Sequence, residues 1–364
     1  ANSSPPIRNS DILCRIGGDE FAILLTHTDV NDAKIAAKEL CRVLADSSFT
    51  FDNQTYKISC SIGIALIDGQ AVSDDIYLQQ ADIAMYAAKE KGRNRTHIYQ
   101  DGDHVTKELK DSFEWVQKLQ HALSQDNVEI HFQPIIDTQS REVLCYEALV
   151  RLVVDGELIY PNRFIPSLEK AEDMNLLDRH VIGKALKIMG ECSFLPKVAI
   201  NLSAQAFGDD RLYAYIESKL NQYNILPSNV VFELTESASL SNITGTKRMV
   251  NRLSELGCHF SIDDFGTGFS TFDYLKQIPA GSVKIDGSFV KDMINQPIDA
   301  VLVKAINETA HALGKTTVAE FVEDEETLIR LAEIGVNYAQ GYYIGKPMNV
   351  NDIEEMEKHS DSAA

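Results

Sequence analysis

Short apolar runs alternate with amphipathic segments along the C-terminal two-thirds of the chain. The runs are rich in β-branched and aromatic residues, which is typical of strands. They span residues 127–136, 143–152, 198–203, 230–237, 259–265, 282–290, 316–323 and 338–345. From the second run onward, segments with a helical spacing of apolar residues separate them, and several end in glycine. These segments are 179–190, 211–220, 247–257, 300–314 and 325–335.

This alternation predicts an α/β fold of the TIM type, a (β/α)₈ barrel. One connection departs from the pattern, because only residues 137–142 separate the first two runs. Parallel neighbours need a crossover of a dozen residues or more, so this linker is too short for one. We therefore expect a modified barrel whose first strand is antiparallel to the second.

The first hundred residues are organised differently. Strand patterns cover 11–26, 56–67 and 95–100, and helical patterns cover 30–45 and 75–91. This order predicts a small α+β sheet domain. The segment 114–123 predicts a helix that joins or opens the second domain.

The net charge of the chain excludes some classes of binding partner. The chain has 34 Lys and Arg against 54 Asp and Glu, a formal net charge of −20. Such a surface repels duplex nucleic acid and anionic lipid, so we expect neither duplex nucleic acid nor membrane contact from this segment. A polyanionic ligand would need metal ions or individually placed arginines.

The cysteines and the hydropathy indicate the compartment. The six cysteines form no CxxC pair, and Cys145 and Cys258 lie within apolar runs, so we expect buried free thiols in a reducing compartment. There is no signal peptide and no apolar run of about 18 residues. We expect a cytoplasmic protein or the cytoplasmic part of a longer protein, and an upstream sensor or anchor stays open.

Polar side chains recur near the ends of the predicted barrel strands, where barrel enzymes normally carry their chemistry. They are Glu147, Asn201, Glu233, Asp263, Asp264, Lys284, Glu320 and Gln340. Singly, each is an ordinary strand-end or capping residue. The period of two places Glu147 and Arg151 on one face, so an ion bridge between them is the structural alternative. Recurrence on consecutive strands favours a shared site.

Asp263 and Asp264 are adjacent at the end of an apolar run. Neighbouring strand residues point to opposite faces, so the chain must turn there if both serve one site. Carboxylate and amide oxygens, without His or Cys, suit Mg²⁺ or Mn²⁺. Two such ions, about 3.5–4 Å apart, can clamp the attacking and leaving oxygens of a phosphodiester.

The segment EALVR, residues 147–151, resembles the name-giving motif of the EAL family of cyclic di-GMP phosphodiesterases. The resemblance runs through nearly all of 109–358 and includes ordered motifs at 132–135, 164–166, 201–203, 233–237, 263–268, 283–286, 319–323 and 339–347. It implies hydrolysis of cyclic di-GMP to linear 5′-pGpG with two Mg²⁺ or Mn²⁺ ions, in a homodimer.

The resemblance also implies roles, position by position. The ligands of one metal match Glu147, Asn201, Glu233 and Asp263, and those of the second match Asp263, Asp264 and Glu320. Lys284 matches a lysine that orients or activates the attacking water, and with Glu147 and Glu320 it forms the catalytic set. The substrate-binding positions match Gln133, Leu149, Arg151 and Gln340, the last of which also supports the site.

Two further acids match positions near the mouth of the barrel. Glu236 matches the glutamate that holds the loop 263–268, although a helix N-cap neighbour is the plain structural interpretation, and Glu323 is a second loop-supporting candidate. Phe321 departs from the family, in which many relatives have glycine. Alternative functions are a non-catalytic cyclic di-GMP receptor and, outside the family, an enolising barrel enzyme. The latter would be expected to show a general-base lysine or histidine pair.

The segment RIGGDEF, residues 15–21, resembles the signature of diguanylate cyclase (GGDEF) domains, although Gly-Gly-Asp alone also favours a tight hairpin. The segments 61–65 and 81–94 fit the same family. The nucleotide and metal positions match Gly17, Gly18, Asp19, Glu20, Lys89 and Arg93. We expect Lys89 and Arg93, at i and i+4, to share a helix face that holds a triphosphate. Arg8 and Asp11 match the inhibitory RxxD site for cyclic di-GMP.

This cyclase-like half is incomplete, because the family places a further strand and a metal-binding Asp well before the motif. We expect residues 1–100 to be only the C-terminal part of a GGDEF domain. Residues 101–126 are then a linker helix, 109–358 the EAL domain and 359–364 a tail. Binding of GTP with Mg²⁺, a purely structural role, and cyclase or bifunctional activity of the full-length protein all stay open, as does regulation of the barrel by this half.

Overall fold

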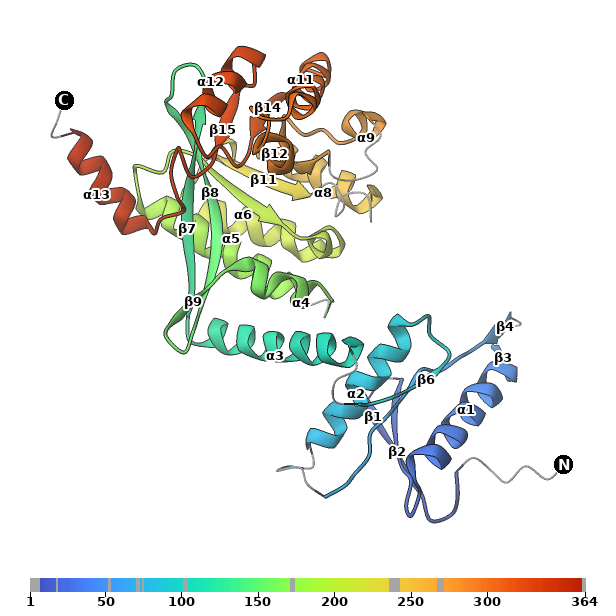
Figure 1. Ribbon diagram of the computed structural model, residues 1–364. Helices are drawn as coiled ribbons and strands as arrows, with labels where there is room; N and C mark the ends of the chain where they lie inside the picture. The colour runs from blue at the N-terminus through green and yellow to red at the C-terminus, as the bar shows by residue number, and fades with distance from the viewer. Residues whose placement is uncertain are drawn as a thin grey trace. The chain divides into compact units, whose positions relative to one another are not determined.

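The computed structural model describes residues 7–17, 19–51, 54–69, 73, 75–100, 104–170, 174–235, 243–266 and 272–361. The chain divides into two compact units, Ala1–Trp115 and Val116–Ala364 (Figure 1). Helix α3 (His104–Ser124) contains the point of division. The predicted helix over 114–123 is confirmed, and it begins ten residues earlier than the pattern indicated.

The second unit is a closed barrel of eight strands. The strands are β7 (Val128–Asp137), β8 (Val143–Val154), β10 (Val198–Leu202), β11 (Val230–Thr235), β12 (His259–Phe265), β13 (Ser282–Ile285), β14 (Thr316–Ala319) and β15 (Tyr338–Gln340). Neighbours from β8 through β10 to β15 pair in parallel, whereas β7 pairs antiparallel with both β8 and β15. The predicted barrel with an antiparallel first strand is confirmed.

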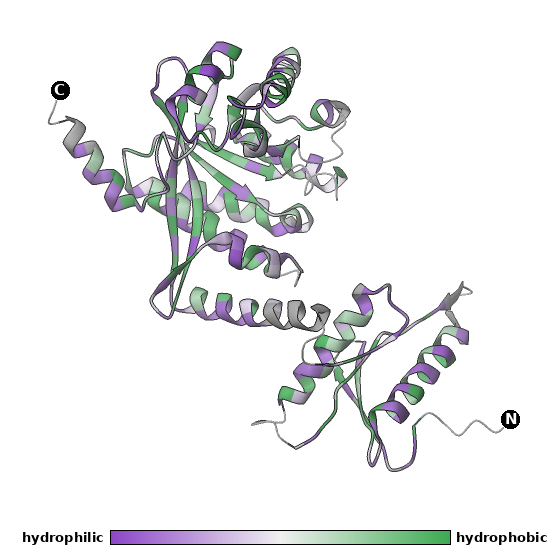
Figure 2. Cartoon of the chain, in the orientation of Figure 1, coloured by the Kyte–Doolittle hydropathy of each residue, from purple (hydrophilic) through white to green (hydrophobic). Residues whose placement is uncertain are grey.

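Helices surround this barrel, and each carries both hydrophilic and hydrophobic residues (Figure 2). They are α4 (Ile165–Lys170), α5 (Met174–Glu191), α6 (Asp210–Gln222), α8 (Ile243–Leu256), α9 (Phe272–Gln277), α10 (Gly287–Val290), α11 (Pro297–Ala312), α12 (Glu325–Ile334) and α13 (Val350–Asp361). Local signals set their ends. In α12, the Asp324 side chain accepts from Thr327 N, and Gly335 closes the helix with a φ of 90°.

The second unit has a densely packed apolar core. Phe132, Phe232 and Phe260 are fully buried or nearly so, and the rings of Phe232 and Phe260 lie 5.8 Å apart. Cys145 and Cys258 are buried free thiols, as their apolar surroundings predicted. Burial on this scale, at roughly 25 cal/mol per Å² of apolar surface, is the main stabilising contribution that holds the strand ends in place.

Several elements differ from the pattern, and β14 and β15 end at Ala319 and Gln340, before the ends of the predicted runs 316–323 and 338–345. The run 282–290 is not one strand, because β13 ends at Ile285 and the Asp286 side chain accepts from Ser288 N to begin α10. A short strand that the pattern did not indicate, β9 (Glu157–Ile159), pairs antiparallel with the end of β8. Strand β8 therefore continues beyond the barrel wall.

The described residues of the first unit form three two-stranded sheets, two complete helices and the first part of α3. The strands are β1 (Ile12–Gly17), β2 (Glu20–Leu24), β3 (Ser48–Phe51), β4 (Gln54–Lys57), β5 (Ile62–Ile64) and β6 (Thr96–Ile98), and the helices are α1 (Val30–Asp46) and α2 (Asp75–Glu90). Strands β1 and β2 form the antiparallel hairpin that the glycine pair indicated. The predicted strand 56–67 is divided between β4 and β5.

Gly341, directly after β15, is expected to tolerate no side chain. A Cβ there would lie well inside contact distance of backbone atoms of Val322, which cannot rotate away. We expect Gly341→Ala to lower the free energy of unfolding by about 2–3 kcal/mol, as overpacked sites do. Gly208→Ala, whose Cβ would meet nothing within 4 Å, is the matched control. Urea unfolding measures both, and equal stabilities would contradict the prediction.

No helix among the described residues is both long enough and apolar enough to cross a membrane.

Candidate active site

The barrel brings the predicted strand-end residues together at one rim. The register of the strand pairs places these residues at matching heights in the barrel. Asn201 on β10 lies opposite Glu233 on β11, and Gln133 on β7 lies opposite Glu147 on β8. The side chains of Glu147, Glu233, Asp263, Lys284 and Gln340 are all buried. In a closed barrel of alternating side chains, such burial of polar groups means that they point inward.

Lys284 lies at the centre of this cluster and is 1% exposed. Its ammonium nitrogen lies within 3.3 Å of four carboxylates. They are Glu320 at 2.8 Å, Glu233 at 3.0 Å, Asp263 at 3.2 Å and Glu147 at 3.3 Å. These acids come from four different barrel strands or strand ends, so the closed barrel is what assembles the cluster.

A second set of donors fixes the Glu147 carboxylate. Asn201 Nδ2 donates to Oε1 at 2.7 Å, and Gln340 Nε2 donates to Oε2 at 2.6 Å. Gln340 Nε2 also donates to Gln133 Oε1, and Gln133 Nε2 donates to the carbonyl of Gly345. Lys284, Gln340 and Asn201 hold the pKa of Glu147 below its usual range despite its burial.

A backbone turn explains how adjacent aspartates serve one site. Asp264 has a φ of 53°, in the left-handed region that aspartate tolerates better than most residues. This turn brings the Asp264 carboxylate to the side of Asp263, against strand alternation. One oxygen each from Asp263, Asp264 and Glu320 lies within 4.8 Å of the others.

The negative charge of this cluster exceeds what Lys284 can neutralise. Burial, with further contributions from neighbouring carboxylates, raises the pKa of Glu320 to about 8 and that of Asp264 to about 6. Burial also raises the pKa of Glu233 well above its usual range. The carboxylates in turn raise the pKa of Lys284, although its burial opposes this. Acids that retain protons in this way indicate a site short of positive charge.

The residues present fit divalent cations. Asp263 Oδ1 is buried and has no hydrogen-bond partner, because its contact with Lys284 Nζ lacks hydrogen-bond geometry. An unsatisfied buried carboxylate oxygen beside Asp264 and Glu320 is the kind of group that a bound cation satisfies. The donors are carboxylates and amides, which suit Mg²⁺ or Mn²⁺. The structure thus brings together the three acids assigned to the second metal, and their role as ligands stays a prediction.

In the absence of divalent cations, stability is expected to fall as the pH rises through about 8. The folded-state pKa of Glu320 lies above the ordinary value of 4.5, so the native state holds the proton more tightly than the unfolded chain does. Its contribution is complete below that ordinary value and is lost as pH rises through the folded pKa. Urea unfolding in a chelator at several pH values measures this slope. Glu320→Gln should flatten it, and an unchanged slope would contradict the assignment.

Arg151 does not form the ion bridge with Glu147 that the period of two allowed. Glu147 instead pairs with Lys284, while Arg151 Nη1 donates to the carbonyl of Val150 at 2.8 Å. The guanidinium lies 4.9 Å from the ring centre of Tyr160, and its buried Nε has no hydrogen-bond partner. Leu149, which lies between Glu147 and Arg151 along β8, is half-buried. Arg151 is thus available for an anionic ligand near the rim.

Three other candidates have different outcomes. Glu236 lies outside the described residues. Glu323 is exposed in the segment after β14 and does not join the buried cluster. Phe321 is 58% exposed with a φ of 56°, a conformation that favours glycine, and its ring lies against Gly287, where any Cβ would clash with it.

Two residues near the site were missed from the sequence. Asp286 begins α10 and its charge contributes to the raised pKa of Asp264. Asp286 lies two residues after Lys284, and this spacing, which places strand side chains on one face, could have indicated it. Tyr160 stacks on Arg151 from beyond β9, and no local pattern indicated that contact.

In the first unit, one prediction is wrong. Lys89 and Arg93 do not share a helix face, because α2 ends at Glu90 and Arg93 has a φ of 56° in the turn that follows. Its N–H closes the helix on the carbonyls of Ala88 and Lys89. Local hydrogen bonding at the C-terminus therefore overrides the i,i+4 spacing.

The other candidates of the first unit lie in or near its hairpin. Gly17, Asp19 and Glu20 are at the turn of β1 and β2, and Gly18 lies outside the described residues. Asp82 has a pKa raised first by burial and then by Glu20, while Lys89 lowers it, so Glu20 and Lys89 act on a common neighbour. Arg8 and Asp11 lie in one turn, where Arg8 N donates to Asp11 Oδ2 at 2.7 Å.

Comparison with known families and proteins adds independent information. The family described as "EAL domain" matches residues 116–347, and "Diguanylate cyclase, GGDEF domain" matches residues 4–95. The chain is 35% identical over 346 residues to "Cyclic di-GMP phosphodiesterase PdeB" of Shewanella oneidensis, a match that covers 93% of this chain and 40% of that protein. It is 31% identical over 354 residues to "Bifunctional diguanylate cyclase/cyclic di-GMP phosphodiesterase MucR" of Pseudomonas aeruginosa. That match covers 95% of this chain and 51% of that protein. The chain thus spans about half, or less, of these relatives.

A solved structure resembles the barrel. "PaMucR Phosphodiesterase, c-di-GMP complex" aligns with a TM-score of 0.62 and 31% identity over 66% of this chain and 99% of that chain. Since the EAL match also covers well over half of the residues, this chain belongs to the EAL domain family, with a GGDEF domain match ahead of its barrel.

Proposed function

We propose that this chain hydrolyses cyclic di-GMP to linear 5′-pGpG at the rim of the barrel. The observation that carries the proposal is the buried cluster of four carboxylates around Lys284, with Asp264 turned toward it. The matching relatives named as cyclic di-GMP phosphodiesterases, and the similar barrel in complex with cyclic di-GMP, support the choice of substrate.

Two divalent cations, when bound, supply positive charge at the scissile phosphodiester and make a water molecule acidic enough to attack near neutral pH. The residues that would hold them are Glu147, Asn201, Glu233, Asp263, Asp264 and Glu320. Asn201 and Gln340 fix the orientation of the Glu147 carboxylate by donating to its two oxygens. Lys284 places a fixed positive charge beside Glu320, where it orients the attacking water and favours the extra negative charge of the transition state.

Substrate binding in a strongly acidic chain requires local positive charge, and Arg151 provides it. Its unpartnered Nε can donate to a phosphate oxygen, while Gln133 presents an amide from the neighbouring strand β7. Tyr160 packs against Arg151 and is still 53% exposed, so its ring offers a flat apolar face to a guanine base. These contacts orient a cyclic dinucleotide above the acids.

Nucleotide chromatography tests the proposal. Cyclic di-GMP incubated with the protein and Mg²⁺ or Mn²⁺ should be converted to pGpG, and a chelator should stop the conversion. Absence of pGpG with either metal, from protein shown to be folded by circular dichroism, would overturn it. Tight binding of cyclic di-GMP without turnover would instead identify a receptor.

A second candidate function concerns the first unit. The GGDEF match and the bifunctional name of one relative favour nucleotide binding or cyclase activity in the longer protein. We propose that GTP binding there regulates the barrel. Hydrolysis measured with and without GTP decides this, since an unchanged rate across all GTP concentrations would remove the regulatory role. Light scattering tests the proposed homodimer in the same samples.

A further inference from the structure

Two cysteines of the first unit lie in direct contact. Cys41 is buried on α1, and Cys60 is half-buried in the segment that leads into β5. Their sulfur atoms are 3.6 Å apart, with the Cys60 thiol donating to Cys41 Sγ. The Cys41 thiol donates to the carbonyl oxygen of Cys60 at 3.5 Å. The two side chains thus face each other across the space between the helix and the strand.

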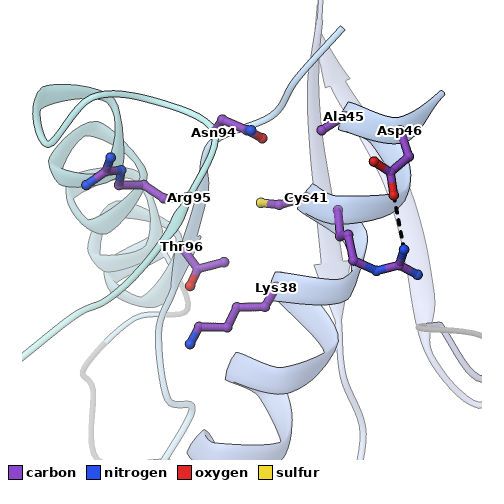
Figure 3. A pocket seen from close by; sticks show the side chains of 8 residues that line it. Lys38, Cys41, Ala45, Asp46, Asn94, Arg95 and Thr96 are labelled. Atoms are coloured by element: carbon purple, nitrogen blue, oxygen red, sulfur yellow. Dashed lines mark hydrogen bonds and ion pairs between the residues drawn. The ribbon is translucent and has the colours of Figure 1, made fainter. Parts of the chain in front are cut away.

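A pocket gives small molecules access to Cys41, which is one of its lining residues. It has a volume of about 430 Å³ and is bordered by α1 and by the residues that lead into β6. Figure 3 shows the Cys41 sulfur directed from α1 toward the segment of Asn94, Arg95 and Thr96. Lys38, Arg42 and Arg95 also line this pocket, so its wall is rich in basic side chains.

The separation suits a covalent bond. A disulfide has an S–S distance of about 2.05 Å, so the sulfurs need to approach by only about 1.5 Å. Cys14 provides a contrast on the same unit, since it is exposed and its thiol donates to the carbonyl of Ala22. The Cys41–Cys60 arrangement therefore predisposes these two thiols to react with each other.

We propose that Cys41 and Cys60 are a reversible oxidation site, where hydrogen peroxide or a similar small peroxide joins them in a disulfide. The Cys41 thiol reacts first, giving a sulfenic acid and one water. The Cys60 sulfur then displaces the hydroxyl group, forming the S–S bond and releasing a second water. Two thiols are oxidised and one peroxide is reduced, so atoms and electrons balance. Burial raises the pKa of the Cys60 thiol to about 12, so this thiol reacts slowly with peroxide by itself.

The bond would tie α1 to the start of β5 and thereby restrain this part of the unit. Strand β5 lies tightly against α2, because a Cβ on Gly63 would overlap the backbone of Ala81 and Met85. Helix α2 carries Lys89, whose charge acts on Asp82 together with that of Glu20. A bond at Cys60 would thus connect α1 with β5 and, through the close packing at Gly63, with α2.

Peptide mapping by mass spectrometry tests the proposal on the intact chain. Trypsin places the three cysteines of this unit on separate peptides, 9–15, 39–42 and 58–89. After folded protein is treated with peroxide and remaining thiols are blocked, peptides 39–42 and 58–89 should appear joined, with the loss of two hydrogen atoms. Reduction with dithiothreitol should separate them again. Amide hydrogen exchange of α1 and β5 should slow in the oxidised protein and recover on reduction.

Matched variants separate a specific site from general thiol oxidation. Cys14→Ser should leave the cross-link unchanged, whereas Cys60→Ser should abolish it and leave Cys41 as a sulfenic acid that a dimedone probe labels. Cys60 is only half-buried, and near-ultraviolet circular dichroism verifies that this variant is folded. The proposal is overturned if 39–42 and 58–89 stay unlinked in folded protein while Cys14 is oxidised. It is also overturned if the link forms only in urea.

Discussion

Replacing Glu147 with alanine is expected to reduce the hydrolysis of cyclic di-GMP by about 10³-fold or more, because it removes a charge that the proposed transition state requires. Glu147 accepts from Asn201, Gln340 and Lys284 and so connects three strands of the rim. Its loss removes one proposed metal ligand and leaves these donors without their acceptor. Chromatography of pGpG measures the rate, and calorimetry should show cyclic di-GMP still binding.

Two further variants make the result specific to the carboxylate. Glu147→Gln keeps the side-chain volume and should lose activity to a similar extent, which excludes a cavity as the cause. Glu157→Gln, at an exposed position of strand β9, should retain the wild-type rate. If Glu147→Gln keeps more than a tenth of the activity, the carboxylate is not the group that the chemistry uses.

Replacing Lys284 with methionine is expected to produce the largest loss of stability in the metal-free protein. The ammonium lies among four carboxylates, and removing one partner of a buried ion pair costs about 3–5 kcal/mol. Divalent cations should restore more stability to this variant than to the wild type, because they supply the missing charge. Urea unfolding in a chelator and in Mn²⁺ measures both effects, independently of turnover.

Lys315 provides the matched control for this substitution. It is also a buried lysine, but its ammonium nitrogen donates to the backbone carbonyl oxygens of Ile278 and Ala280. Lys315→Met should therefore lose stability by an amount that Mn²⁺ leaves unchanged. If Lys284→Met is as stable as the wild type in a chelator, Lys284 does not hold the acids together as the geometry indicates.

The sequence predicted the barrel because short apolar runs alternate with helical segments along the second unit and end in polar residues. It also predicted that the acids would share a rim, since parallel strands end on the same side. It could not show that Lys284 would lie within 3.3 Å of four carboxylates, because that geometry depends on the closure of the whole sheet. The alternative of a Glu147–Arg151 bridge was reasonable from spacing alone for the same reason.

Local backbone chemistry accounts for the remaining differences. The spacing of Lys89 and Arg93 fits a helix, yet the chain leaves the helix at Glu90 through left-handed residues. The turn at Asp264 follows the same principle, and here it builds the site instead of ending an element. Single residues with positive φ carry little signal in a sequence when they are not glycine.

The direction of β7 has a consequence for how a signal could reach the barrel. In an all-parallel barrel the chain enters at the end opposite the chemistry. Here Val128, the first residue of β7, lies beside Leu152, beyond Glu147 on the rim side. A displacement of the chain just before Val128 would therefore need to pass along only five residues of β7 to move Gln133. Gln133 contacts Gln340, which is hydrogen-bonded to Glu147.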